Sequence, residues 1–89
     1  MSASYIRSPD ATESLVGDRM VLYHRVSRTA LVLNPTGTRL WRLLEHPCTT
    51  DALVRDLCGA HRSLTEDQAA RDVDTFLKDL SQHAMVSAG

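Results

Sequence analysis

Two short segments that contain His and Cys have the residue types needed for metal chemistry. His46-Pro-Cys48 and Cys58-Gly-Ala-His61 together supply two imidazoles and two thiols. Structural zinc sites use such ligands in closely spaced pairs joined by a longer loop. Here one pair is separated by one residue and the other by two, and a buried free Cys behaves as a small hydrophobe. We therefore predict no metal site and no cofactor, with a zinc site as the alternative.

Patterns typical of catalytic sites are missing from the sequence. It contains no Ser-x-x-Lys, no Gly-x-Ser-x-Gly and no glycine run that could cradle a phosphate, because its four glycines stand singly. The four histidines are scattered over positions 24, 46, 61 and 83. We therefore expect a binding protein that is not an enzyme and has no catalytic residue.

Composition restricts the partners. The chain has 89 residues, enough for one domain, and a net charge of −1. Nucleic-acid binders usually carry a basic excess, which this chain lacks. Its apolar runs are too short to span a membrane, and residues 1–10 do not resemble a signal peptide. Two cysteines without a secretory signal indicate free thiols, so we expect a cytoplasmic protein that binds neither nucleic acid nor membrane.

The first third of the chain is predicted to form strands. Residues 1–11 are polar and are expected to be a flexible arm. Short apolar segments at 13–16, 19–25 and 29–33 are separated by turn residues, with Gly17 supplying the positive φ of the first turn. Consecutive hairpins of this kind form a three-stranded antiparallel meander.

Three helices are expected after the strands. Pro35 suits the first helical position, and Gln68 completes a capping box before a helix that runs to about Gln82. The expected N-cap residues are Asn34, Thr49 or Thr50, and Thr65. The fold class is therefore α+β, a winged helix-turn-helix-like domain over residues 12–86 in which a three-stranded antiparallel sheet precedes three helices.

The third predicted strand lies at the edge of this sheet. It consists of Thr29, Ala30, Leu31, Val32 and Leu33. Sheet edges are normally guarded by charge or proline, and this strand has neither. Such an edge is either covered by the protein's own elements or kept open for a partner. Leu31 and Leu33 are expected to face the core, so the main chain of Ala30 and Val32 would make the contact.

The third predicted helix supplies a second wall. Its apolar stripe is centred on Val73 and Phe76, with Leu77 and Ala70 at one extreme beside Asp74. We expect a wall made by Ala70, Val73, Asp74 and Leu77. The alternative is that Leu77 and Ala70 complete the core.

The order of these elements coincides with a characteristic series of residues. It runs through Leu33-Asn34-Pro35-Thr36-Gly37, Leu40-Trp41, Leu43-Leu44, Thr49-Thr50-Asp51-Ala52-Leu53, Asp72-Val73, Phe76-Leu77 and Leu80. Over residues 13–86 the chain resembles the PqqD-like family, the recognition elements of ribosomally made precursor peptides. It departs from the family at His83-Ala84, where a Gly usually precedes the final apolar pair.

The resemblance implies that the leader segment of a precursor peptide adds as a strand beside residues 29–33, against the third helix. It also implies that the domain presents the precursor to a leader peptidase or another tailoring enzyme. The Asn34–Gly37 segment looks more like the lasso-peptide type than like the chaperone type of pyrroloquinoline quinone biosynthesis. The resemblance therefore favours an open edge.

Two alternatives use the same fold differently. The first is a winged-helix DNA-binding regulator, for which the third helix would enter the major groove. That helix carries Glu66, Asp67, Asp72, Asp74 and Asp79 against Arg71 and Lys78. Its excess of acids would repel phosphates, while Arg19, Arg25 and Arg28 in the hairpins are predicted to attract an acidic peptide. The second alternative is a dimer in which the open edge pairs with a second copy.

Overall fold

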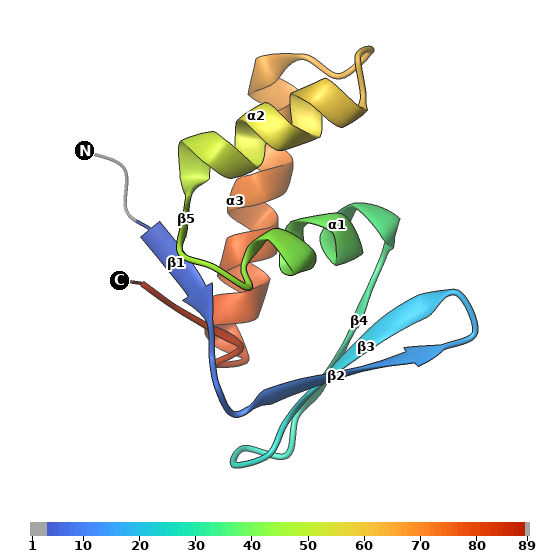
Figure 1. Ribbon diagram of the computed structural model, residues 1–89, viewed down its shortest axis with the longest axis vertical. Coiled ribbons are helices and arrows are strands. Elements are labelled where there is room, and N and C mark those ends of the chain that lie inside the picture. The colour runs from blue at the N-terminus through green and yellow to red at the C-terminus, as the bar shows by residue number, and fades with distance from the viewer. Residues whose placement is uncertain (1–3, 89) are drawn as a thin grey trace.

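The computed structural model describes residues 4–88 as two small sheets and three helices (Figure 1). The strands are β1 (Ser4–Arg7), β2 (Ala11–Val16), β3 (Arg19–His24), β4 (Ala30–Leu33), β5 (Cys48–Thr49) and β6 (Val86–Ala88). The helices are α1 (Pro35–Leu43), α2 (Thr50–Ala60) and α3 (Glu66–Gln82). The predicted α+β fold, with a three-stranded antiparallel sheet before three helices, is confirmed.

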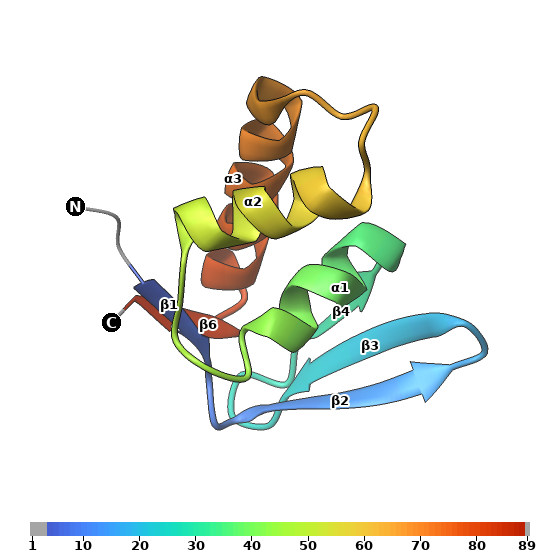
Figure 2. The same cartoon turned by 45° about the horizontal axis from the view of Figure 1, so that its top comes forward.

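The larger sheet has the predicted strand order β2-β3-β4 and is antiparallel throughout. Gly17 joins β2 to β3 and has a φ of +66°, a conformation that glycine adopts without a steric penalty. The alternation along β3 buries Met20, Leu22 and His24. This face of the sheet is covered by the helices, and α1 lies directly over it (Figure 2).

The N-terminal segment differs from the flexible arm that we expected over residues 1–11. Residues 1–3 lie outside the described part of the chain, but Ser4–Arg7 forms β1, the central strand of a second sheet with order β5-β1-β6. Tyr5 lies opposite both Cys48 and Ala88. The domain therefore begins before residue 12, because strands far apart in the sequence complete the ladders of β1.

The helices begin at the predicted residues. Asn34 Oδ1 accepts a hydrogen bond from the Gly37 amide at 2.7 Å, and Thr49 caps α2. Thr65 and Gln68 form the predicted capping box of α3, which ends at Gln82. A Cβ at position 37 would lie 3.2 Å from Asn34 Oδ1, so glycine allows the close approach of α1 to the end of β4.

The hydrophobic core lies between the helices and the larger sheet. Its largest fully buried side chains are Trp41, Leu22, Leu40, Leu44, Leu53, Leu57, Leu80, Met85 and Val73. On the surface, Arg39 of α1 makes two hydrogen bonds to the Asp56 carboxylate of α2, at 2.7 and 3.2 Å. Both the hydrogen bonds and the charge of Asp56 raise the pKa of Arg39.

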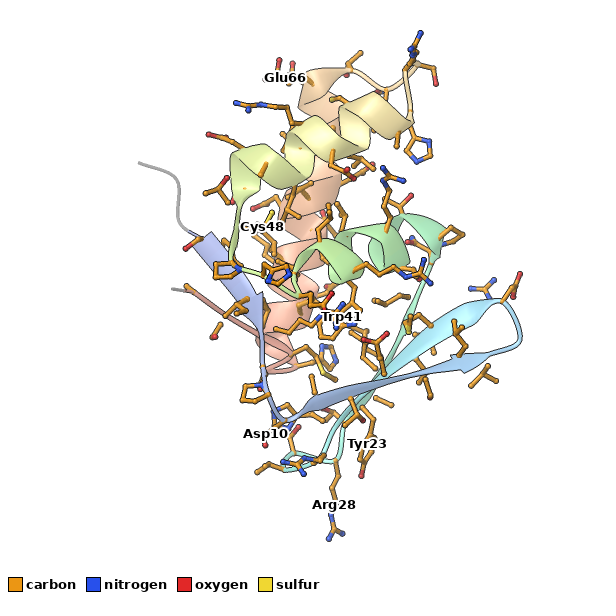
Figure 3. The ribbon with its side chains drawn as sticks, viewed as in Figure 1. Asp10, Tyr23, Arg28, Trp41, Cys48 and Glu66 are labelled. Carbon is orange, nitrogen blue, oxygen red and sulfur yellow. The ribbon has the colours of Figure 1, made fainter. Side chains whose placement is uncertain are left out.

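Arg7 ties the N-terminal strand to the core helix α1. Its guanidinium lies 4.6 Å from the centroid of the Trp41 ring and donates to the Trp41 carbonyl at 2.9 and 3.0 Å. The same group pairs with Glu13 Oε1 of β2 at 2.8 Å, and the Trp41 indole donates to that oxygen at 3.3 Å. Figure 3 shows Trp41 between α1 and the sheet. The three residues therefore hold β1, β2 and α1 together.

Candidate functional site

One of the two edges of the larger sheet is the main chain of β4. The His24 amide donates to the Thr29 carbonyl at 2.9 Å, so these opposite residues form a hydrogen-bonded pair. Such pairs alternate with non-hydrogen-bonded pairs along an antiparallel ladder. With the observed register, the amide and carbonyl of Leu31 face β3, and those of Ala30 and Val32 face away from it. β4 therefore presents two N–H and two C=O groups at its free edge.

The side chains of β4 follow the predicted alternation. Leu33 is buried and Leu31 is partly buried, whereas Ala30 and Val32 are exposed. The main chain of Ala30 and Val32, which the sequence indicated, is thus the part of this edge that a partner could reach.

A groove of about 280 Å³ lies beside this edge, between β4 and α3. From β4 and the start of α1 it is lined by Leu31, Val32, Leu33, Asn34, Thr36, Gly37 and Leu40. From α3 it is lined by Asp72, Thr75, Phe76 and Asp79. An extended peptide paired with Ala30 and Val32 would therefore have β4 on one side and Phe76 on the other.

The wall formed by α3 differs from the one that we expected. Of the predicted residues Ala70, Val73, Asp74 and Leu77, none lines the groove. Val73 and Leu77 lie in the core, with 0% and 6% of their surface exposed. Ala70 and Asp74 are exposed elsewhere on the helix. At about 100° per residue, the observed wall lies on the opposite flank of the buried stripe.

Tertiary packing decides which flank faces the groove. α3 contacts both α2 and β6, and in the folded chain Leu77 is buried while Phe76 is half-buried. Sequence reasoning placed Phe76 in the core and missed Asp72, Thr75 and Asp79. Together with Phe76, these residues occupy positions i, i+3, i+4 and i+7, a spacing that is typical of a single helix face. That spacing places these residues on one face with Phe76, but it could not show that this face lines the groove.

The basic residues of the hairpins lie outside the groove lining. Arg25 Nη2 pairs with Asp10 Oδ1 at 3.0 Å, and Arg28 points away from the domain (Figure 3). Neither they nor Arg19 lines the groove. The groove lining therefore contains no arginine that could attract an acidic peptide, as we had predicted for the hairpin residues.

The His and Cys residues do not come together as a metal site. Within residues 4–88, no group of three or more His, Cys, Asp or Glu side chains is arranged to hold a metal ion. Burial raises the pKa of the Cys48 thiol, and the negative charge of Asp56 raises it further. The Cys48 thiol is therefore less acidic than an exposed cysteine and a weaker nucleophile, because the thiolate is the reactive form.

The sequence of this region matches a known family. Residues 19–86 match the family described as coenzyme PQQ synthesis protein D (PqqD). The chain belongs to the PqqD family. The matched segment of this PqqD-family domain starts at the first residue of β3 and ends at the first residue of β6. It therefore contains β4, α3 and every residue that lines the groove.

Two solved structures are similar to this PqqD-family domain. One is described as TbiB1 in complex with the TbiA(beta) leader peptide; the TM-score is 0.82 and the identity 26%, over 92% of this chain and 94% of the other. The second, a lasso peptide synthetase B1 complexed with the leader peptide, has a TM-score of 0.77. At 18% identity, over 93% of this chain and 96% of the other, it shows the same fold.

No curated protein matches the chain. In the described part of the PqqD-family domain, none of the helices has the length and apolar character needed to cross a bilayer.

Proposed function

We propose that this PqqD-family domain binds the leader segment of a ribosomally made precursor peptide. The leader adds as a strand beside β4, in the groove against α3. The observation that carries this proposal is the position of the outward main-chain groups of Ala30 and Val32, which have no backbone partner within residues 4–88. They lie beside a groove whose other wall contains Phe76.

The similarity to solved complexes supports this proposal. The structure with 26% identity is described as a complex with a leader peptide, and so is the more distant lasso peptide synthetase B1. Both cover more than nine-tenths of this chain. We propose that the domain acts in lasso-peptide biosynthesis, where it presents the bound precursor to a leader peptidase or another tailoring enzyme, and that it does so in the cytoplasm.

Strand addition divides the work of recognition between main chain and side chains. The guest's main chain hydrogen-bonds to the strand edge whatever its sequence, and its alternate side chains enter the groove. In this domain, β4 (Ala30–Leu33) supplies the edge, and Phe76 supplies the apolar part of the opposite wall. The domain acts by binding and orienting the precursor, and the enzyme it serves carries out the chemistry.

The test is a binding titration with the leader of the precursor encoded beside this chain's gene. Fluorescein-labelled leader should show saturable fluorescence polarisation, and the core segment of the same precursor should not compete. Failure of the leader to bind the folded domain would overturn the proposal. Saturable, salt-sensitive binding of random duplex DNA would support the DNA-binding alternative instead.

The family description favours a second candidate function. Since the family is described as a coenzyme PQQ synthesis protein, the guest could be the precursor peptide of pyrroloquinoline quinone. Titration of the leaders of both precursor types against the same domain separates the two functions, because the cognate leader should bind more tightly.

Sedimentation tests the alternative of a dimer paired through β4. If two copies pair at this edge, added leader should convert dimer to monomer. If the edge is open, the domain should sediment as a monomer with and without the leader.

A further inference from the structure

The groove is acidic on its α3 side. Asp72 and Asp79 line it, and its lining contains no Lys or Arg. Both residues are exposed. Among residues 4–88 the ion pairs are Arg7–Glu13, Arg25–Asp10, Arg39–Asp56 and Lys78–Asp74. The two groove carboxylates therefore have no cationic partner within the described domain.

The end of α3 strengthens the negative potential in this region. Asp79 lies in the last turn of the helix, and that turn contains no basic residue. The C-terminus of a helix carries a partial negative charge, which a cation nearby would stabilise. The His83 ring contacts the main-chain carbonyl of Asp79 at 2.8 Å. Because this contact does not involve the side chain of Asp79, it does not neutralise the carboxylate.

The spacing of the two carboxylates suits the side chains of an extended peptide. Asp72 and Asp79 are two helical turns apart, about 10 Å along the axis, with Phe76 between them. Side chains on one face of a strand repeat every ~6.6 Å. The long stems of Lys and Arg extend the reach of their charged groups by several atoms. A guest with basic side chains on either side of an apolar one can therefore meet both carboxylates and Phe76.

We propose that Asp72 and Asp79 select a basic guest. The preferred peptide places an apolar side chain against Phe76 and Lys or Arg side chains near the two carboxylates. This proposal rests on leader binding in the groove, as proposed above, and it specifies the charge of the leader. It reverses the expectation of an acidic peptide, since the charge that faces the guest is that of α3 and not that of the hairpin arginines.

The experiment uses the whole domain and two fluorescein-labelled probes. The first probe is the native leader, and the second is the same leader with every Lys and Arg replaced by Gln. Each is titrated at low and at high salt against the wild-type domain, D72N/D79N, D72E/D79E and D74N. Asp74 is the matched control, because it lies on the same helix, is paired with Lys78 and does not line the groove.

The wild-type domain should bind the native leader about tenfold more tightly than the neutralised one at low salt, and added salt should reduce the difference. D72N/D79N should lose this preference, D72E/D79E should restore it, and D74N should keep it. Circular dichroism should remain native, since all three side chains are exposed.

Three results would overturn the proposal. The first is a D72N/D79N variant that binds the native leader with the affinity and salt dependence of the wild type. The second is a D74N variant that loses the preference for the native leader as fully as D72N/D79N does. The third is a wild-type domain that binds the neutralised leader more tightly than the native one. In each of these cases the wild-type domain still binds a leader, so leader binding itself would stand. If neither probe binds the wild-type domain, the function proposed above fails as well.

Discussion

The two edges of the larger sheet show what separates a strand edge from a binding site. At the β2 edge, the Arg25 amide donates to the Asp10 carbonyl at 3.0 Å, so the alternation directs the main-chain groups of Glu13 and Leu15 outward. At the β4 edge, the same rule directs those of Ala30 and Val32 outward. The hydrogen-bonding capacity of the two edges is therefore the same in kind.

The surroundings of the two edges differ. Residues 12–16 of β2 are all exposed, whereas β4 lies beside a groove whose second wall is α3. The exposed hairpin that contains β2 extends away from the helices (Figures 1 and 2). Main-chain groups alone provide no specificity and no apolar contact, so the groove is what qualifies β4 for peptide binding. The comparison can be tested by changing one edge or one wall at a time.

Proline at the β4 edge should have the largest effect on binding. Val32→Pro removes an amide that points at the guest and leaves the β3 ladder intact, because proline is tolerated where the amide faces outward. We expect leader affinity to fall at least about tenfold, since the loss of one hydrogen bond and the bulk of the ring act together. Fluorescence polarisation measures the loss.

Leu15→Pro is the matched control for Val32→Pro. It removes an outward amide from the β2 edge, where no second wall is present. The leader affinity of this variant should equal that of the wild type. Equal losses in the two variants would contradict the assignment of the site to β4.

Neighbouring positions on α3 should separate binding from stability. Phe76→Ala removes the apolar side chain of the groove wall and should weaken leader binding by several-fold to tenfold, because about 1 kcal/mol of apolar contact is lost. Leu77→Ala should instead lower the free energy of unfolding by about 2–5 kcal/mol, because Leu77 is buried in the core. Urea titration and leader titration of both variants measure the two quantities. A Leu77→Ala variant that is fully stable but fails to bind would restore the wall predicted from the sequence.

Removal of the Arg7 side chain should affect stability without affecting the β4 edge. Arg7→Ala eliminates the contacts with the Trp41 ring and carbonyl and the pair with Glu13. We expect the free energy of unfolding to fall by about 1–2 kcal/mol, with leader affinity unchanged. Arg28→Ala is the control, since Arg28 is exposed and points away from the domain. A large loss of affinity in Arg7→Ala would show that β1 also shapes the groove.

The smallest effect is expected where α3 leaves the groove wall. Ala84 has a φ of +57°, a left-handed conformation that costs a non-glycine residue about 1–2 kcal/mol. Ala84→Gly should therefore raise the free energy of unfolding by about 0.5–1 kcal/mol, after the greater entropy of glycine in the unfolded chain is subtracted. Ala70→Gly, within α3, should lower it by about 1 kcal/mol. Urea titrations of both variants measure the difference, and the same sign for both would contradict this explanation.

The positive φ of Ala84 falls at the one departure from the family pattern that the sequence showed. The resemblance led us to expect Gly before the final apolar pair, and in this chain the position is occupied by alanine in a conformation that suits glycine. The chain therefore turns at the end of α3 through a strained backbone conformation at Ala84. After this turn, Met85 and Val86 are buried in the core.

The sequence by itself determined the local elements and the identity of the edge strand. Asn34, Thr49 and Thr65 cap the helices as predicted, and the alternation of β4 exposes Val32 and buries Leu33. These features depend on residues a few positions apart, where periodicity and capping chemistry act directly. That β4 is an edge strand could therefore be predicted before its surroundings were known, whereas the sequence pattern left open whether this edge is covered.

Only the tertiary structure decided the place of β1 and the flank of α3 that faces the groove. β1 pairs with segments more than 40 residues away, at β5 and β6, which no local pattern indicates. The apolar stripe of α3 has two flanks, and its spacing cannot say which one packs against α2 and β6. In the folded chain Leu77 is buried, and Asp72, Phe76 and Asp79 line the groove beside β4. The chemistry of the groove wall therefore follows from long-range contacts, whereas the strand edge that it faces follows from the sequence.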